Sequence, residues 1–146
     1  SMHSGLIAVG SPNGASSWVK VYRLNGTSFT LEATISPPTS EDGSFGTSVA
    51  LANRKLLVGA PGGSGSLLPL RANNNAHAYL YEWEYNNSTS AMAWTRKLSL
   101  NPSYSTGTKS LFGTSVDLSD VYSIIGNGSS ATGSEINQVY IYPTAP

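Results

Sequence analysis

The sequence contains no cysteine, few charged residues and no apolar run long enough to cross a bilayer. Without cysteine, neither disulfides nor thiolate metal sites can form. Charged residues are 11% of the chain, against about a quarter in typical soluble domains. The eight basic side chains balance the eight acidic ones, so no excess positive charge favours binding to nucleic acid or an anionic membrane. Nucleic acid partners and membrane insertion are therefore disfavoured.

Titratable side chains suited to catalysis are also scarce. Apart from His3, the only histidine is His77, and its place at the start of a predicted strand favours a half-exposed structural residue. No Gly-x-Ser-x-Gly elbow joins a strand to a helix. Because the partners of a catalytic triad need not be close in sequence, a hydrolase using His77 with Glu41 or Asp42 is the distant alternative. We predict no catalytic residue and no cofactor.

What the sequence does contain is a repeat. The pentapeptide Phe-Gly-Thr-Ser-Val occurs at residues 45–49 and again at 112–116. A pattern that recurs tens of residues apart is typical of a structural unit that stacks on copies of itself. Residues 7–12, 56–61 and 123–128 are also alike, since each is an apolar run broken by glycine. Each predicts a short buried strand that ends in a turn where glycine takes positive φ.

Two further elements complete the unit. Residues 18–23, 78–82 and 139–142 are β-branched or aromatic, a composition that favours strands. Residues 29–37 and 94–102 both begin with an aromatic residue and end with proline, and apolar residues alternate with polar ones in the first copy. Ten strands are predicted, and no segment has a sustained apolar period near 3.6 residues. The fold class is therefore predicted to be all-β.

This order, a Phe-Gly strand and then an apolar strand ending in Gly-Ala-Pro at 59–61, resembles the FG-GAP repeat. In that family the repeat is the four-stranded blade of the β-propeller of integrin α subunits and of many bacterial surface proteins. The resemblance implies one propeller-like domain over residues 5–143. About two and a half blades are expected: a partial blade at 5–37, a full blade at 45–102 and a partial blade at 112–143.

The sequence departs from that family in one respect that concerns metal binding. Many FG-GAP blades carry an Asp-x-Asp-x-Asp-Gly calcium loop between their first and second strands. The matching links here, 52–54 and 119–120, are too short to supply the roughly six to eight oxygen ligands that calcium takes. Arg54 would also place positive charge beside the cation, and Asp117 and Asp120 are interpreted as solvated turn residues. No metal site is predicted.

The long link from residue 62 to residue 75 is the first candidate for a binding site, because loops on a rigid β scaffold often carry binding function. The resemblance places it on the ligand-facing side of a propeller. The favoured interpretation of its leucines is that they pack under the blade or against a second chain. In the functional interpretation, polar contacts surround a small apolar platform and come from Arg71, Asn73, Asn74, Asn75 and His77.

Aromatic residues give a second candidate. Trp83 and Tyr85 lead into the polar segment 86–90. An exposed aromatic ring beside amide and hydroxyl groups suits a sugar, whose C–H face stacks on the ring while its hydroxyls form hydrogen bonds. The alternative, which is favoured, is that Trp83 continues the strand of Tyr79 and Tyr81 and belongs to the core.

The predicted units do not make a complete ring, since propellers usually have four to eight blades. The first unit lacks its Phe-Gly strand and the last lacks its fourth strand, which leaves strand edges exposed. Either the chain is a fragment of a longer propeller, or identical chains complete the ring, and we predict a homodimer. Residues 1–4 are interpreted as a cloning remnant or start, outside the domain.

Taken together, these features predict a non-enzymatic recognition or adhesion module that binds a protein or carbohydrate ligand through propeller-face loops. The alternative is a purely structural or oligomerising repeat protein with no small ligand. Family resemblance implies an extracellular or cell-surface location.

Overall fold

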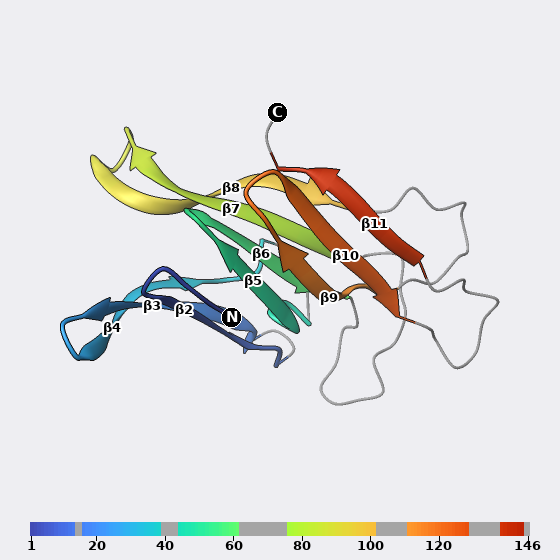
Figure 1. Cartoon of the computed structure of the whole chain (residues 1–146), viewed down its shortest axis with the longest axis horizontal. Helices are drawn as coiled ribbons and strands as arrows, with labels where there is room; N and C mark the ends of the chain where they lie inside the picture. Colours follow the sequence, from blue (N-terminus) through green and yellow to red (C-terminus); the bar gives the residue numbers. More distant parts are fainter. Residues whose placement is uncertain (14–15, 39–43, 62–75, 102–110, 129–137, 145–146) are drawn as a thin grey trace.

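The computed structural model describes residues 1–13, 16–38, 44–61, 76–101, 111–128 and 138–144. Within these ranges the chain forms eleven β-strands in three antiparallel sheets (Figure 1). The predicted all-β fold class is confirmed. The described part of the chain contains no helix that could span a membrane.

Each sheet is built from strands that follow one another along the chain. The first sheet has the order β1-β2-β3-β4 and comprises β1 (Met2–His3), β2 (Leu6–Ser11), β3 (Trp18–Asn25) and β4 (Ser28–Ile35). The second sheet has the order β5-β6-β7-β8 and comprises β5 (Ser48–Ala52), β6 (Lys55–Ala60), β7 (His77–Asn86) and β8 (Ala91–Leu100). The third sheet has the order β11-β10-β9 and comprises β9 (Leu111–Leu118), β10 (Tyr122–Gly128) and β11 (Gln138–Pro143).

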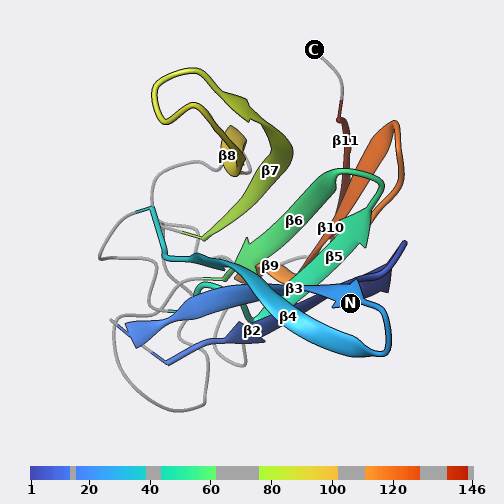
Figure 2. The same cartoon turned by 90° about the vertical axis from the view of Figure 1, so that its left-hand side faces the viewer.

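The second sheet lies between the other two. Its strands contact β1, β2 and β4 of the first sheet and β9 of the third, and the three sheets are seen side by side in Figure 2. A strand with both faces covered should be apolar throughout. Accordingly, all of β6 except its first residue is buried.

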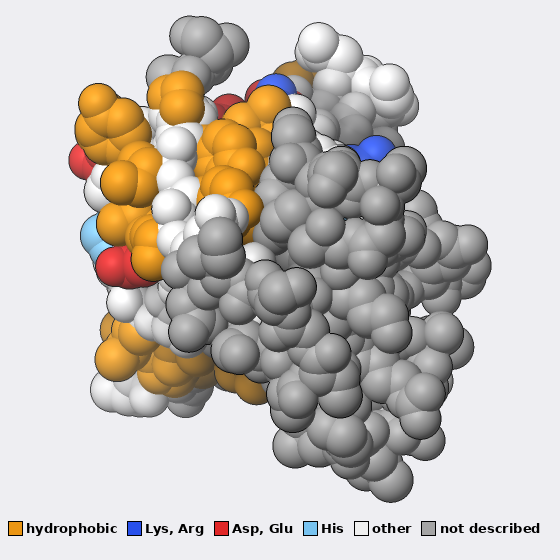
Figure 3. Space-filling model, turned by 90° about the vertical axis from the view of Figure 1, so that its right-hand side faces the viewer, with side chains coloured by type: hydrophobic (Ala, Val, Ile, Leu, Met, Phe, Trp, Pro, Cys, Tyr) orange, Lys and Arg blue, Asp and Glu red, His pale blue; other side chains and the backbone are white. Residues whose placement is uncertain are grey.

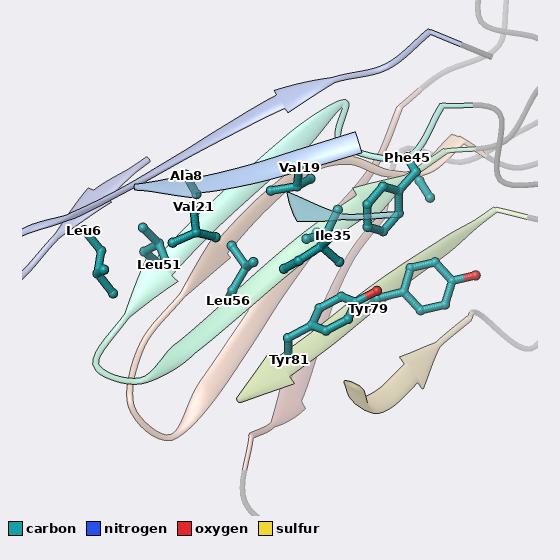
Figure 4. Packing of buried hydrophobic residues seen from close by; sticks show 12 residues of the cluster. Leu6, Ala8, Val19, Val21, Ile35, Phe45, Leu51, Leu56, Tyr79 and Tyr81 are labelled. Atoms are coloured by element: carbon teal, nitrogen blue, oxygen red, sulfur yellow. The ribbon is translucent and has the colours of Figure 1, made fainter. Parts of the chain in front are cut away.

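Two hydrophobic cores hold this stack together. On one face of the second sheet, Leu56 and Tyr81 pack against Val21 of the first sheet and its neighbours (Figure 4). On the other face, Leu57 and Leu80 belong to a cluster with the apolar residues of the third sheet. The two repeated phenylalanines are fully buried, Phe45 in the first core and Phe112 in the second. Each burial stabilises the fold by about 1.5–3 kcal/mol.

Glycines allow the sheets to approach closely. Gly46 and Gly113, the glycines of the two Phe-Gly pairs, have φ of 87° and 89°, values that non-glycine residues rarely adopt. Each lies against a second-strand glycine of the preceding sheet. A Cβ added to Gly10 would overlap the carbonyl oxygen of Gly46, and one added to Gly59 would overlap that of Gly113. The same contact therefore recurs at both sheet interfaces.

The prediction that the second-strand glycines take positive φ was wrong. Gly10, Gly59 and Gly126 lie within β2, β6 and β10, and none is among the residues with positive φ. These positions need glycine because another backbone or side chain occupies the space of a Cβ. Positive φ falls instead on the glycine of Phe-Gly.

The hydroxyl groups of the pentapeptide also have defined partners. Thr47 Oγ1 donates to the carbonyl of Ser44 at 2.7 Å, and Thr114 Oγ1 donates to that of Leu111. Each bond closes the tight turn of a Phe-Gly pair. Ser48 Oγ reaches across the interface and donates to the carbonyl of Gly113 at 2.8 Å.

The structure has one strand more than the ten predicted. Met2–His3 pairs with β2 through Met2↔Ile7 and His3↔Leu6, although residues 1–4 were placed outside the domain. Ser1 extends this pairing, because its ammonium donates to the carbonyl of Ala8 at 3.0 Å and its carbonyl accepts from the Ala8 amide at 2.9 Å. Backbone hydrogen bonding, which needs no apolar pattern, explains why the sequence did not show this strand.

Candidate functional site

Turns from the second and third sheets meet beside the end of β7. The link between β5 and β6 is Asn53–Arg54, and that between β9 and β10 is residues 119–121. The side-chain amide of Asn53 donates to the carboxylate of Asp120. Lys55 Nζ donates to the backbone carbonyl of Asp120 at 2.8 Å. The corresponding turn of the first sheet, with His3 and Ser4, borders the same region.

Trp83 of β7 is held at this place from several directions. The guanidinium of Arg54 donates to the backbone carbonyl of Trp83 through Nε at 3.1 Å and Nη2 at 2.8 Å. In return, the Trp83 amide donates to the Arg54 carbonyl at 2.8 Å. The indole packs on Trp94, its cross-strand neighbour on β8, with ring centroids 5.6 Å apart. Trp83 is therefore fixed in position while remaining half-buried.

Two hollows meet at Trp83, each of a size typical of ligand sites, about 300–1,000 Å³. The first has a volume of about 430 Å³ and the second about 440 Å³. Both are lined by Asn53, Arg54 and Trp83. The first is completed by Lys55, Glu82, Glu84 and Asp120. The second is completed by His3, Ser4, Leu6, Arg23 and Met92.

Charges of both signs line the first hollow. Lys55 Nζ lies 3.9 Å from the Glu82 carboxylate. Lys97 Nζ lies 2.6 Å from the Glu84 carboxylate, and this hydrogen bond is the main reason why the pKa of Glu84 is lowered from its ordinary value of 4.5. The Glu84 carboxylate is thus ionised near neutral pH and acts only as a hydrogen-bond acceptor.

The second hollow has an arginine over its aromatic wall. The guanidinium of Arg23 lies 5.9 Å from the centroid of the Trp83 ring, within the range of a cation–π interaction. Arg23 is paired with Glu32 on the neighbouring strand, and the other Glu32 oxygen accepts from Trp94 Nε1 at 3.3 Å. Side chains of the first two sheets thereby form one connected network behind the hollow.

The residues predicted from the sequence do not lie together. Trp83 lines both hollows. It also continues the strand of Tyr79 and Tyr81, as the alternative interpretation required. Tyr85 is 56% exposed further along the hairpin. His77 is six residues before Trp83 on the same strand, about 20 Å away at the rise of a β-strand. Four more predicted ligand contacts lie outside the described residues: Arg71, Asn73, Asn74 and Asn75.

Every lining residue of the two hollows except Trp83 was missed as a ligand contact. Among them, Asn53, Arg54 and Asp120 were considered only in the argument against a calcium loop. The available signal was their place in the repeat, because turns between the same two strands of stacked units lie on the same side of the stack. Comparing turns across the repeat would have brought them together.

Only part of the alternative hydrolase arrangement lies within the described residues. His77 stacks on Tyr79 with ring centroids 5.5 Å apart, and its proposed partners Glu41 and Asp42 are not among the described residues. No group of three or more His, Asp or Glu side chains in the described ranges is placed to hold a metal ion. The prediction that Asp117 is a turn residue was wrong, because Asp117 lies within β9 and pairs with Ile124. Its exposed carboxylate accepts from the Leu118 amide at 2.9 Å.

Comparison with known proteins does not extend these observations. No family model, no curated protein and no solved structure matches the chain.

Proposed function

We propose that this chain is a non-enzymatic recognition module that binds carbohydrate at the site around Trp83. The observation that carries this proposal is the position of the half-buried Trp83, which lines both hollows and has amide and guanidinium groups of Asn53, Arg54 and Arg23 around the second. An indole offers an apolar face for the C–H groups of a sugar ring. The surrounding polar groups donate and accept the hydrogen bonds that its hydroxyls need.

The two hollows differ in charge. Three carboxylates and two cations line the first hollow, namely Glu82, Glu84, Asp120, Lys55 and Arg54. The second hollow is lined by Arg23 and Arg54, and Arg23 is already paired with Glu32. The Trp83 side chain is on the same face of β7 as Tyr79 and Tyr81, which pack toward the first sheet, so a sugar stacked on its ring would occupy the second hollow. Protein recognition, the other possibility raised by the sequence, has no comparable feature in its favour at these two hollows.

The architecture is proposed to be an FG-GAP-like propeller assembly, open in this chain. Support comes from the Phe-Gly motif, the four-stranded units and the repeated glycine contact between sheets. A ring would be completed by blades from a second chain. The homodimer predicted from the sequence could not supply them through a free Phe-Gly pair, because both pairs of this chain are seated on its own glycines. An extracellular or cell-surface location follows from the family resemblance and belongs to the same proposal.

Binding to a glycan array, followed by titration of the best-bound oligosaccharide, tests the function. We expect Trp83→Ala to weaken binding at least tenfold, equivalent to about 1.4 kcal/mol. Trp18→Ala is the matched control, because Trp18 is another half-buried tryptophan, lies on the first sheet and lines neither hollow. This control should bind as the unmodified chain does.

A second variant covers the case in which Trp83→Ala fails to fold. Asn53 has a φ of 39°, which glycine adopts without strain, so Asn53→Gly removes an amide from both hollows while keeping the turn. It should weaken oligosaccharide binding several-fold. An array with no saccharide above background, or equal affinities for the folded Trp83 and Trp18 variants, would show that the site does not bind carbohydrate.

A further inference from the structure

The interface between the second and third sheets shows how one repeat unit receives the next. The Phe-Gly pair of the third sheet places the backbone of Gly113 against Gly59. Ser48, directly opposite Gly59 in the β5–β6 register, donates its hydroxyl to the Gly113 carbonyl at 2.8 Å. Gly59 and Ser48 together therefore form a seat for an incoming Phe-Gly pair.

The third sheet carries the same seat on its outer face. Ser115 is opposite Gly126 in the β9–β10 register, as Ser48 is opposite Gly59. The Ser115 hydroxyl lies in the space that a Gly126 Cβ would occupy, again as at Gly59. The atoms nearest to a Cβ added at Gly126 all belong to Ser115, whereas the nearest atoms at Gly59 include the backbone carbonyl of Gly113. The seat on the third sheet is thus formed but vacant within the described part of the chain.

Apolar side chains surround this vacant seat. Leu57, Ala78 and Leu80 are fully buried where the second sheet faces the third. When Gly126 is aligned with Gly59, strand pairing places Ile124, Val139 and Ile141 at the equivalent positions of the third sheet. There their exposed fractions are 42%, 68% and 64%. Seen from this end of the molecule, apolar side chains gather into a patch (Figure 3). Contiguous exposed apolar groups mark an interaction surface.

We propose that the outer face of β10 and β11 docks a further sheet of the same repeat, one that begins with Phe-Gly. The glycine of such a sheet would lie against Gly126, and its carbonyl would accept a hydrogen bond from the Ser115 hydroxyl. The face of the sheet that carries the phenylalanine would cover Ile124, Val139 and Ile141. Both Phe-Gly pairs of this chain are already seated, on Gly10 and Gly59. A second copy therefore has no free Phe-Gly pair to offer, and the occupant is a Phe-Gly blade of a different chain.

Hydrogen exchange on the full chain tests this docking, with a synthetic peptide of the sequence of residues 44–61 as the probe. That peptide contains Phe-Gly and the next two strands of a unit. We expect it, at millimolar concentration, to slow exchange of the β10 and β11 amides in a saturable manner. A peptide with Gly46→Val should not, because this glycine has positive φ and lies close to Trp18 and Val19 of the receiving sheet.

A change in the receiving sheet gives a second, independent readout. Gly126→Ala would place a methyl group where the incoming backbone must lie, and the Ser115 hydroxyl can rotate away from it. We expect peptide binding to weaken at least about tenfold. Protection that is equal for both peptides, or absent, would overturn the proposal. So would protection of β10 and β11 that rises with protein concentration and no peptide, since a second copy would then be the occupant.

Discussion

Single residues of the Phe-Gly-Thr-Ser-Val motif each have a separate structural role. The phenylalanine is buried in the core, and the glycine adopts positive φ against the preceding sheet. The threonine closes the turn, while the first copy of the serine bonds to the following sheet. The valine packs against the core. The motif therefore contacts both the preceding and the following sheet of the stack. These combined contacts explain why the five residues recur together.

Also at the scale of single residues, the ion pair of Lys97 and Glu84 at the edge of the site should make the stability of the fold depend on pH. The hydrogen bond from Lys97 lowers the pKa of Glu84. A carboxyl group with a lowered pKa stabilises the fold above its unfolded pKa, and this contribution is lost as pH falls through the folded pKa. Lys97→Met should therefore raise the Glu84 pKa toward 4.5, measured by NMR titration of the side-chain carboxyl carbon.

Lys20→Met is the control for that titration. Lys20 lies over the ring of Trp18 at 4.6 Å from its centroid, on the first sheet. Its removal should leave the Glu84 titration unchanged. If Lys97→Met also leaves the Glu84 pKa where it was, the ion pair at the rim of the first hollow does not persist in solution.

Among the elements, the two equivalent serines allow a matched test of how sheets are joined. Ser48→Ala removes the hydrogen bond to Gly113 between the second and third sheets and should lower the free energy of unfolding by about 1 kcal/mol. Ser115→Ala changes the equivalent residue where the described structure has no facing sheet, and should be neutral. Urea denaturation measures both. Equal effects of the two changes would contradict the assigned sheet interface.

Most strands could be predicted because the apolar alternation and the aligned copies of the repeat indicated the same segments as strands. β7 and β8 run further than predicted because Trp83 and Trp94 form a cross-strand pair that prolongs the hairpin. β1 could not be predicted, since two residues held by backbone pairing carry no pattern. Positive φ was assigned to the wrong glycines because a close approach between sheets and a tight turn both select glycine.

The site was only partly predictable for a related reason. Trp83 was found from its residue type and polar neighbours. Asn53 and Arg54 become neighbours of Trp83 through strand pairing within the second sheet, and Asp120 joins them through stacking of the third sheet. Both depend on contacts far apart in the sequence. The length of the loop at 62–75 drew attention to residues that the structure does not describe, whereas the tight turns formed the site.

For the molecule as a whole, one stacking rule accounts for both proposed functions. Seating of a Phe-Gly glycine on the preceding sheet positions the turns that surround Trp83. The same rule, applied once more, leaves the outer face of the third sheet ready to receive a further unit. The first proposal concerns a hollow at one side of the stack, and the second concerns its end. Loss of oligosaccharide binding would leave the docking proposal untouched.

The unfolding free energies of Gly59→Ala and Gly126→Ala test the stacking rule most directly. Both changes place a methyl group at the same position of the repeat, beside an equivalent serine hydroxyl. Within the described ranges only Gly59 of the two faces another sheet, with its added Cβ 2.9 Å from the Gly113 carbonyl carbon. We predict that Gly59→Ala costs about 3 kcal/mol and lowers the melting temperature by roughly 10 °C, whereas Gly126→Ala changes stability by no more than about 0.5 kcal/mol. Equal losses for the two variants, or no loss for Gly59→Ala, would contradict the account.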